Sequence, residues 1–527
     1  MKNKRFLEWN VYQIYPRSFM DSNGDGIGDI KGITSKLDYL KELGINAVWL
    51  SPCYKSPNCD NGYDIADYRD IMDEFGTLDD WKEMIAGMHA RGIKLIMDYV
   101  GNHTSSEHEW FKKARTSRGN PYHDYYIWRD TPPNDWQSCF RGSAWEYNEL
   151  TNEYYLHSFA IGQPDLNWEN PKVRKEMCDI IDYWVDLGVD GFRCDVIGFI
   201  AKDFEKGLMQ NGPKLHEYIH ELFGREKVKN IFTVGENSMG MDSIMDICGE
   251  DRDELKCIFQ FDHIDHGRSN KYLKVKPDID KLKNTLVKWQ YFTEENNLLY
   301  TLFTDNHDQP HFINRGGYDG KNRYEVATMY ATMFYLLKGI PFIYQGQEFG
   351  TLDPHYDDIA DFNDIETINY YNDHKEDCDI LDRINVGSRD NARRPLCWNN
   401  TKNYGFSTAD KTWIKLHSQG KEINLENDRK SDKSVFAYYQ KLLALRNTGD
   451  VVKYGKFADL TIDDGYFAYT RTLDNEIILV VCNFDKEKNI LNLPVGKYIF
   501  GNGSAARATN GKYAPFEAAV FNVSKME

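Results

Sequence analysis

Residues 94–103 read KLIMDYVGNH and decide how the rest of the chain is interpreted. Lys94–Tyr99 is a short apolar run typical of a buried strand, and polar residues follow it directly. Seven similar runs occur in the first 350 residues, separated by longer amphipathic stretches. Repeated alternation of strand and helix predicts a parallel sheet, and eight strands predict a (β/α)8 TIM barrel of the α/β class.

The elements of this barrel can be placed on the sequence. The expected strands are Val11–Tyr15, Ala47–Leu50, Lys94–Tyr99, Gly191–Val196, Ile231–Gly235, Cys257–Phe261, Leu299–Thr304 and Pro341–Tyr344. The expected helices include Lys31–Leu43, Asp79–Arg91, Pro171–Leu187 and Tyr324–Leu337.

Two stretches depart from this alternation. From Thr104 to Trp168 the sequence is rich in Gly, Pro, Asn and Trp, so we expect an inserted lid domain after the third strand. Beyond about Tyr454 we expect a C-terminal antiparallel β domain with no helix between its strands. Those strands are Gly465–Thr472, Glu476–Asn483, Lys497–Phe500 and Phe516–Val523. The predicted domains are a catalytic barrel at 1–103 and 169–454 with a loop subdomain at about 350–399, a lid at 104–168 and a β-sandwich at 455–527.

Composition and net charge limit the class of protein and the kinds of binding partner to be expected. Apolar residues make up 41% and charged residues 28% of the 527 residues, which excludes a disordered or collagen-like chain. The 82 acidic and 64 basic residues give a net charge of −18, which disfavours nucleic acid and anionic lipid as partners. We find no signal peptide, no apolar run of the ~20 residues that a membrane span needs, and no CxxC pair among ten cysteines. We therefore expect a cytoplasmic monomer with free thiols.

Polar residues follow five of the expected strands. Because the active site of a (β/α)8 barrel lies at the carboxyl ends of its strands, these side chains are expected to converge. The segments are Asp98–His103, Arg193–Asp195, Val234–Glu236, Asp305–Asp308 and Gln345–Glu348. The alternative for all of them is an ordinary salt-bridge network at the barrel mouth.

Three carboxylates in these segments suggest acid–base chemistry. Arg193 and Asp195 are two residues apart on one strand, so their side chains share a face and the guanidinium favours an ionised Asp195. Glu236, from the next strand, is expected near that charge in a confined pocket, which favours its protonated form. One carboxylate would then act as a nucleophile and the other as an acid. Asp308 could stabilise an oxocarbenium-like charge.

Several segments resemble the conserved regions of glycoside hydrolase family 13, the α-amylase family. They are DYVGNH (98–103), GFRCD (191–195), VGEN (234–237), TDNHD (304–308) and QPDLNW (163–168). SRDNAR (388–393) and DNGYD (60–64) narrow the resemblance to the oligo-1,6-glucosidase and α-glucosidase subfamily. The similarity covers essentially the whole chain.

The resemblance implies roles for individual residues. Asp195 would be the nucleophile, Glu236 the general acid/base and Asp308 the transition-state stabiliser of a retaining mechanism, with the first two carboxyl groups about 5–5.5 Å apart. The substrate-binding residues that it implies are Asp60, Tyr63, His103, Gln163, Arg193, Val196, His307 and Arg393. Among them, Asp60 and Arg393 match the pair that closes the pocket around the non-reducing end, which implies an exo-acting α-glucosidase that releases glucose. The two histidines lack HExxH spacing, so we expect them to donate hydrogen bonds to sugar hydroxyls and not to bind zinc.

Linkage preference depends on Val196. Similar enzymes that cleave α-1,6 bonds tend to carry Val after the nucleophile, whereas maltase-like relatives tend to carry Thr, so isomaltose and short isomalto-oligosaccharides are the expected substrates. Packing alone would also explain a Val at the end of a buried strand. The alternatives are an α-1,4-glucosidase (maltase), a trehalose-6-phosphate hydrolase, a sucrose isomerase or transglucosidase and, remotely, a non-catalytic scaffold. The segment Gln309–Gly317 lacks the Arg cluster of sucrose isomerases, and a scaffold would have lost its catalytic carboxylates.

Three positions depart from the family pattern and leave the outer subsites open. They are Asn237, Arg394 and Cys397. An extra arginine near the pocket could meet a phosphate, but we expect Arg394 to be a surface or salt-bridge residue.

One loop suggests a structural metal. Residues 21–29 read DSNGDGIGD, with oxygen side chains at alternate positions, and resemble the structural calcium loop of some α-glucosidases. The implied ligands are Asp21, Asn23, Asp25 and Asp29 through side chains and Ile27 through its carbonyl. Position twelve of the loop is Gly32, so this is not an EF-hand sensor. Ca²⁺ is expected, Mg²⁺ or a polar turn without an ion is the alternative, and no organic cofactor is expected.

Overall fold

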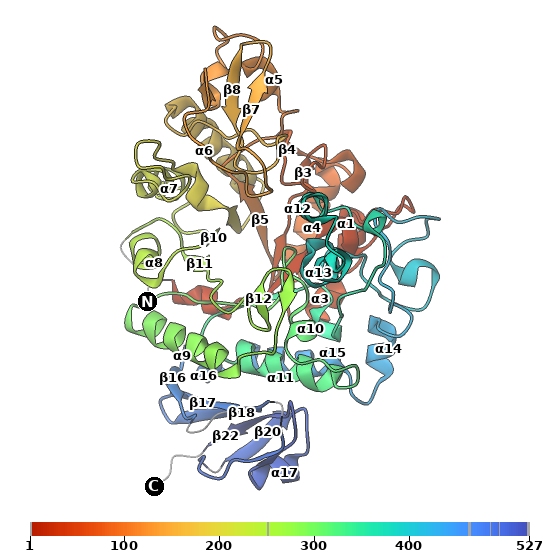
Figure 1. Ribbon diagram of the computed structural model, residues 1–527. Helices are drawn as coiled ribbons and strands as arrows, with labels where there is room; N and C mark the ends of the chain where they lie inside the picture. Colours follow the sequence, from red (N-terminus) through yellow and green to blue (C-terminus); the bar gives the residue numbers. More distant parts are fainter. Residues whose placement is uncertain (1–2, 250–251, 462–464, 485, 495, 524–527) are drawn as a thin grey trace.

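Eight parallel strands form the centre of the molecule (Figure 1). The computed structural model describes residues 3–249, 252–461, 465–484, 486–494 and 496–523. The sheet order is β11-β10-β9-β5-β2-β1-β15-β14, and its two edges meet where Thr301 Oγ1 donates to Ile258 O at 3.3 Å. This arrangement confirms the predicted TIM barrel. The strands are β1 (Val11–Ile14), β2 (Ala47–Leu50), β5 (Lys94–Val100), β9 (Gly191–Asp195), β10 (Phe232–Glu236), β11 (Cys257–Phe259), β14 (Thr301–Leu302) and β15 (Ile340–Tyr344).

Helices cover the barrel, and one of them differs from expectation. The predicted helix Lys31–Leu43 is two helices, α2 (Ile30–Thr34) and α3 (Leu37–Leu43). The break has a local cause, because Thr34 Oγ1 and Ser35 Oγ donate to the carbonyls of Ile30 and Gly32 and compete with the helical ladder. The other three expected helices are present as α4 (Leu78–Ala90), α6 (Pro171–Asp186) and α11 (Arg323–Tyr335).

The remaining elements lie in loops or on the outside of the barrel. The helices are α1 (Pro16–Phe19), α7 (Leu215–Phe223), α8 (Met241–Cys248), α9 (Ile279–Glu295), α10 (Phe312–Arg315), α12 (Ile365–His374), α13 (Ile380–Gly387), α14 (Leu425–Lys430), α15 (Val435–Thr448) and α16 (Asp450–Tyr454). Two small hairpins pair β3 (Tyr54–Lys55) with β4 (Asp67–Ile71) and β12 (Arg268–Asn270) with β13 (Leu273–Lys274).

The inserted segment after β5 carries its own small sheet. Helix α5 (Glu109–Ala114) precedes three antiparallel strands in the order β6-β8-β7, namely β6 (Trp128–Arg129), β8 (Glu153–Leu156) and β7 (Trp145–Asn148). Figure 1 shows this segment projecting at one end of the molecule, while the C-terminal sheet lies at the other. We call residues 104–168 the lid.

The C-terminal sheet is antiparallel, as predicted, but a helix interrupts it. Its order is β16-β17-β18-β22-β20, with β16 (Lys456–Asp459), β17 (Tyr466–Leu473), β18 (Glu476–Asn483), β22 (Ala518–Asn522) and β20 (Lys497–Gly501). The expectation of no helix is wrong, since α17 (Ala505–Thr509) lies between β20 and β22. Ser504 caps α17, and the alanine-rich sequence that follows has high helix propensity.

The two faces of this sheet pack against different cores. Tyr469 and Val480 belong to the large core that includes α11, and Tyr469 Oη donates to Met333 O at 3.0 Å. Leu479 and Phe521, on the other face, form a small separate core. In the described part of the chain, no helix is long and apolar enough to cross a membrane.

Candidate active site

The carboxyl ends of the strands bring the predicted catalytic residues together. Asp195 ends β9 and Glu236 ends β10, which pair in parallel. Arg193 lies between them, since its Nη1 donates to Asp195 Oδ1 and its Nη2 to Glu236 Oε2, both at 2.6 Å. The same Nη1 donates to Asp98 Oδ1 on β5 at 2.9 Å. One guanidinium therefore fixes three carboxylates from three neighbouring strands.

Asp98 is absent from the predicted site residues. It is fully buried and also accepts a hydrogen bond from Trp49 Nε1 at 3.1 Å. A signal was available, because a carboxylate inside the apolar run of residues 94–100 needs a buried partner.

Burial affects the protonation expected for Asp195. Desolvation raises the pKa of the Asp195 carboxyl well above its usual value, and the ion pair with Arg193 acts in the opposite direction. Desolvation also raises the pKa of Asp98 to about 6. The expected ionisation of Asp195 rests on the charge of Arg193, whereas the burial of Asp195 adds a desolvation cost that the sequence does not reveal. The ionised Asp195 and the protonated Glu236 remain predictions.

Val196 has an unusual backbone conformation. Its φ of 37° and ψ of 43° are left-handed, which a β-branched residue rarely adopts. The strand β9 ends at Asp195, so the explanation of Val196 as a strand-end packing residue is wrong. Instead, its N–H donates to Glu236 Oε2 at 3.3 Å, and its side chain is partly exposed.

Tyr63 and His307 connect the carboxylates around Arg193 to the side of the site that carries Asp308. The Tyr63 hydroxyl donates to Asp98 Oδ2 at 3.1 Å and lies 2.6 Å from His307 Nε2. Gln13 Nε2 donates to His307 Nδ1 at 2.9 Å, which assigns the proton of the neutral imidazole to Nε2. Burial lowers the pKa of His307 to about 3, so the ring is neutral near pH 7.

Asp308 is held by cations. Its Oδ1 accepts from Arg393 Nη2 at 2.7 Å, and Arg389 Nη1 is 3.4 Å away. Burial alone would raise the pKa of Asp308, but the neighbouring His307, Arg393 and Arg389 outweigh it and hold the pKa well below its usual value. Because His307 is neutral, the two arginines carry the positive charge.

Asp60 is hydrogen-bonded to Arg389, the first arginine of SRDNAR, and not to Arg393. Asp60 Oδ1 accepts from Arg389 Nη2 at 3.1 Å, and the same nitrogen donates to Asp364 Oδ1 at 2.6 Å. Arg393 instead donates to Asp308 and to His307 O, and the prediction that Asp60 and Arg393 together close the pocket around the non-reducing end stays a prediction. Both arginines belong to SRDNAR (388–393), and the sequence alone does not tell which one faces Asp60.

His103 and Gln163 complete the predicted set. Gln163 Nε2 donates to Asp60 Oδ2 at 3.2 Å and lies 3.1 Å from His103 Nε2. Burial lowers the pKa of His103 to about 4. Asn102, next to it, accepts a hydrogen bond from Lys202 Nζ at 2.8 Å. Hydrogen bonds and ion pairs therefore join all eight predicted substrate-binding residues, Arg393 included, and the three carboxylates into one largely buried network.

The structure shows the surroundings of the three positions that depart from the family pattern, Asn237, Arg394 and Cys397. Arg394 is buried over the rings of Tyr356, at 4.2 Å, and Phe362, at 5.5 Å, so the expected surface position is wrong. It donates to the carbonyl oxygens of Asp361 and Lys415. Asn237 Nδ2 donates to Asn211 Oδ1 at 2.7 Å, and Cys397 is buried.

The predicted metal loop holds its carboxylates in hydrogen bonds to the backbone. Asp21 accepts from the N–H groups of Asn23, Gly24 and Gly26 at 2.7–3.0 Å. Asp29 caps α2 by accepting from Gly32 N. Within the described residues, no group of three or more His, Cys, Asp or Glu side chains could hold a metal ion. The predicted ligand set, which adds an asparagine and a carbonyl, stays a prediction.

Comparisons with known proteins give the same family as the sequence motifs. The family described as "Alpha amylase, catalytic domain" matches residues 13–455. The chain is 49% identical to an oligo-1,6-glucosidase of Parageobacillus thermoglucosidasius, over 92% of this chain and 91% of the relative. It is 44% identical to an oligo-1,6-glucosidase of Bacillus cereus, over 99% and 100%. A crystal structure of Bacillus licheniformis trehalose-6-phosphate hydrolase superposes with a TM-score of 0.93 at 38% identity, covering 99% and 100% of the two chains. The chain belongs to the α-amylase family, glycoside hydrolase family 13.

Proposed function

We propose that this member of the α-amylase family is a retaining, exo-acting α-glucosidase that releases glucose from isomaltose and short isomalto-oligosaccharides. The observation that carries the proposal is the Arg193 fork, which holds Asp195 and Glu236 side by side at the ends of adjacent strands. Retaining glycosidases need two carboxyl groups of this kind close together.

In the proposed mechanism, Asp195 attacks the anomeric carbon while Glu236 protonates the leaving oxygen. Arg193 favours the anionic form of Asp195 that the attack requires, because its positive charge acts against the desolvation that raises the pKa of this carboxyl. Water, activated by Glu236, then hydrolyses the glycosyl–enzyme intermediate. The Val196 N–H and Arg193 Nη2 fix the same oxygen of Glu236, so its carboxyl group has a defined orientation.

Asp308 is the third carboxylate of the proposed mechanism, after Asp195 and Glu236. The arginines that depress its pKa keep it ionised at physiological pH, so it can stabilise the positive charge that develops on the sugar ring. The low-dielectric surroundings strengthen this interaction relative to water.

The closed end of the pocket supports release of one glucose at a time. Asp60, Arg389 and Asp364 form a buried network there, and Gln163 donates to Asp60 from the lid. A chain that extended beyond the non-reducing end would have to displace these groups and leave buried charges unpaired, which is costly.

The conformation of Val196 supports the preference for α-1,6 bonds. Strand propensity does not account for a β-branched residue at φ 37°, so its identity is better explained by what its side chain presents to the substrate. We expect Val196→Thr to shift the ratio of kcat/KM for isomaltose over maltose toward maltose by about 10-fold, the scale of one net hydrogen bond. Val196→Ile, which adds no hydroxyl, is the matched control. An unchanged ratio in Val196→Thr would remove the linkage argument.

The alternatives have less support from the site. Arg394 is buried among rings and is not placed to meet a phosphate, which disfavours a trehalose-6-phosphate hydrolase. Arg315, in the segment where sucrose isomerases carry arginines, is buried and donates to Thr304 O.

The proposal also includes a cytoplasmic monomer with a structural calcium ion and no organic cofactor. All ten cysteines are free, as a reducing compartment allows. Calcium would be bound by Asp21, Asn23, Asp25, Asp29 and the Ile27 carbonyl and would stabilise the loop. Metal analysis of protein purified without chelator should find about one Ca²⁺ per chain, and a chelator should lower the melting temperature. Finding no divalent ion would remove the site, and finding Mg²⁺ would change its identity.

The first experiment is glucose release from isomaltose, maltose, sucrose, trehalose and trehalose-6-phosphate in parallel. A strong preference for isomaltose supports the proposal. Preference for maltose or trehalose-6-phosphate would keep the catalytic assignment and overturn the substrate, whereas an isomer of sucrose as product would overturn hydrolysis.

A further inference from the structure

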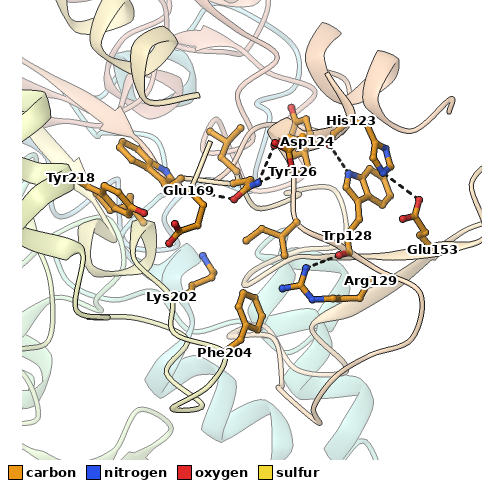
Figure 2. Close-up of a pocket in the computed structure, with 15 residues that line it drawn as sticks. His123, Asp124, Tyr126, Trp128, Arg129, Glu153, Glu169, Lys202, Phe204 and Tyr218 are labelled. Carbon is orange, nitrogen blue, oxygen red and sulfur yellow. Dashed lines mark hydrogen bonds and ion pairs between the residues drawn. The ribbon is translucent and has the colours of Figure 1, made fainter. Parts of the chain in front are cut away.

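The lid is attached to the rest of the chain on two sides. On one side, Figure 2 shows Arg129 of β6 beside Phe204 of the loop after β9, and the Arg129 guanidinium lies 4.6 Å from the centroid of the Phe204 ring. On the same side, Lys202 Nζ pairs with Asp165 Oδ2 at 2.9 Å, and both side chains are buried. These contacts fix the lid against the barrel on this side.

On the other side, the lid meets α12 through Phe140 and Arg141. Arg141 Nη1 donates to Asp373 Oδ2 at 2.8 Å, and its guanidinium lies 4.8 Å from the centroid of the Tyr370 ring. Asn369 Nδ2 donates to the carbonyl oxygen of Phe140 at 2.8 Å. Three residues of one helix therefore hold two consecutive residues of the lid.

The backbone of this part of the lid forms a tight turn. Arg141 has a φ of 77°, a left-handed conformation that costs free energy in a residue with a Cβ atom. Two backbone hydrogen bonds of 2.9 Å close the turn, from Arg141 N to Ser138 O and from Ser138 N to Gly142 O. The turn and its contacts with α12 together give Phe140 a defined position.

The ring of Phe140 covers the face of the Arg389 guanidinium. The guanidinium carbon lies 4.8 Å from the centroid of the ring, and Phe140 is buried. Carboxylates occupy the edges of the same guanidinium, since its Nη2 donates to Asp60 and Asp364 and its Nε donates to Asp364. Carboxylates fix a planar guanidinium within its own plane, whereas a ring over its face fixes its tilt.

Helix α12 connects these contacts. Asp364 caps the helix by accepting from the N–H groups of Glu366 and Thr367, and it also pairs with Arg389. The same helix holds the lid through Asn369 and the residues after it. Arg389 thus lies between a carboxylate at the start of the helix and a lid ring that the helix keeps in place.

We propose that Phe140 is a positioning residue for Arg389. By covering the guanidinium, the ring holds Arg389, and through it Asp60, in the orientation that receives the non-reducing end of the substrate. The contacts with α12 keep the ring there. This inference rests on the proposed α-glucosidase function and names what the lid contributes to it.

The test is steady-state kinetics of the full chain on isomaltose and on nitrophenyl α-glucoside, whose leaving group is not a sugar. Phe140→Leu keeps an apolar side chain and removes the ring, so KM should rise about 5-fold. The change in kcat should stay within about 2-fold, because Arg193 holds the catalytic carboxylates separately. Phe140→Tyr retains the ring and should keep both constants within about 2-fold of wild type. A lowered kcat with an unchanged KM in Phe140→Leu would overturn the inference.

A double-mutant cycle separates positioning from direct contact with the sugar. If Phe140 acts through Arg389, Phe140→Leu should change KM by less than about 2-fold in a protein that already carries Arg389→Gln. The full effect in that background would show that the ring acts on the substrate itself, and the positioning role would be lost.

Asn369→Asp tests the link to α12, because it replaces the donor to Phe140 O by a second acceptor. KM should rise about 2- to 5-fold with little change in kcat. Asn372→Asp is the matched control, since it makes the same change of charge at an exposed position of α12 outside these contacts and should leave both constants within about 2-fold. Equal effects of the two variants would overturn the role of the helix.

The outcomes distinguish this inference from the function on which it rests. A wild-type protein inactive on both substrates would overturn the proposed function and the inference together. Activity on either substrate that is indifferent to Phe140→Leu would overturn the inference alone.

Discussion

Two arginine-centred regions form the catalytic pocket, and they are built differently. Arg193 holds Asp98, Asp195 and Glu236, all of which lie on three adjacent barrel strands. Arg389 holds Asp60 and Asp364, which lie on loops more than 300 positions apart in sequence. The register of the parallel sheet dictates the first region, whereas the second depends on how separate loops meet. We therefore expect chemistry to depend on the Arg193 region and substrate fit on the Arg389 region.

The largest effect is expected at Asp195. Asp195→Asn removes the nucleophile but keeps the shape, so kcat should fall by about 10⁴-fold or more while the fold is retained. Glucose release, with circular dichroism as the check on folding, measures this. Residual activity above about one per cent of wild type would mean that Asp195 is not the nucleophile.

Arg193→Lys keeps the positive charge of the Arg193 region but removes the forked hydrogen bonds to its carboxylates. A lysine ammonium has no planar fork, so it cannot hold Asp195 and Glu236 in the same way. We expect kcat to fall about 10²- to 10³-fold with a smaller change in KM. A full pH profile is the second readout, because weaker support for the Asp195 anion should move the acidic limb to higher pH. An unmoved limb would show that Arg193 only positions the two groups.

The Arg389 region can be tested with a double-mutant cycle. Asp60→Asn and Arg389→Gln should each raise KM for isomaltose about 10-fold, and the double variant should be little worse than either single one. Asp60→Asn combined with Arg393→Gln is the comparison, and there we expect the effects to be closer to additive because Arg393 donates to Asp308 and not to Asp60. Equal or stronger coupling of Asp60 with Arg393 would show that Arg389 is not the main partner of Asp60.

Glu348 sharpens the comparison because it is a buried carboxylate without an arginine. It accepts from Tyr12 Oη at 2.8 Å and from Tyr39 Oη, and burial raises its pKa to about 7. A pKa above the unfolded value means that the native state binds the proton more tightly. Its contribution to stability is therefore full below about pH 4.5 and is lost as the pH rises through about 7.

Glu348→Gln, which keeps an acceptor for the tyrosines, should remove this loss. We expect the melting temperature to rise relative to wild type by a few degrees at pH 8 and by less at pH 5. The free energy gained at pH 8 is at most about 3 kcal/mol. An equal or larger gain at pH 5 would mean that the buried charge is not the cause.

The difference between the Arg193 and Arg389 regions also explains which features could be predicted from the sequence and which could not. The eight strands and the residues at their ends were predictable because hydrophobic runs mark strands and a parallel barrel collects their carboxyl ends. Arg389 was not, because SRDNAR places two arginines on one short turn and only tertiary contacts choose between them. Asp98 was placed in a segment expected at the active site but was given no role, and the left-handed backbone of Val196 leaves no mark on the sequence. Helix α17 was missed because a turn-rich segment concealed a short alanine-rich run.

The packing of the two faces of the C-terminal sheet determines whether the protein can be divided into independently folding parts. One face is shared with α11 of the barrel through Tyr469 and Val480, so separating the chain near residue 455 would uncover apolar surface on both pieces. Barrel and sheet should then melt in a single cooperative transition, and neither should be exchangeable between homologous enzymes as an independent module. A chimera would have to carry the contact surface of α11 together with the sheet that covers it.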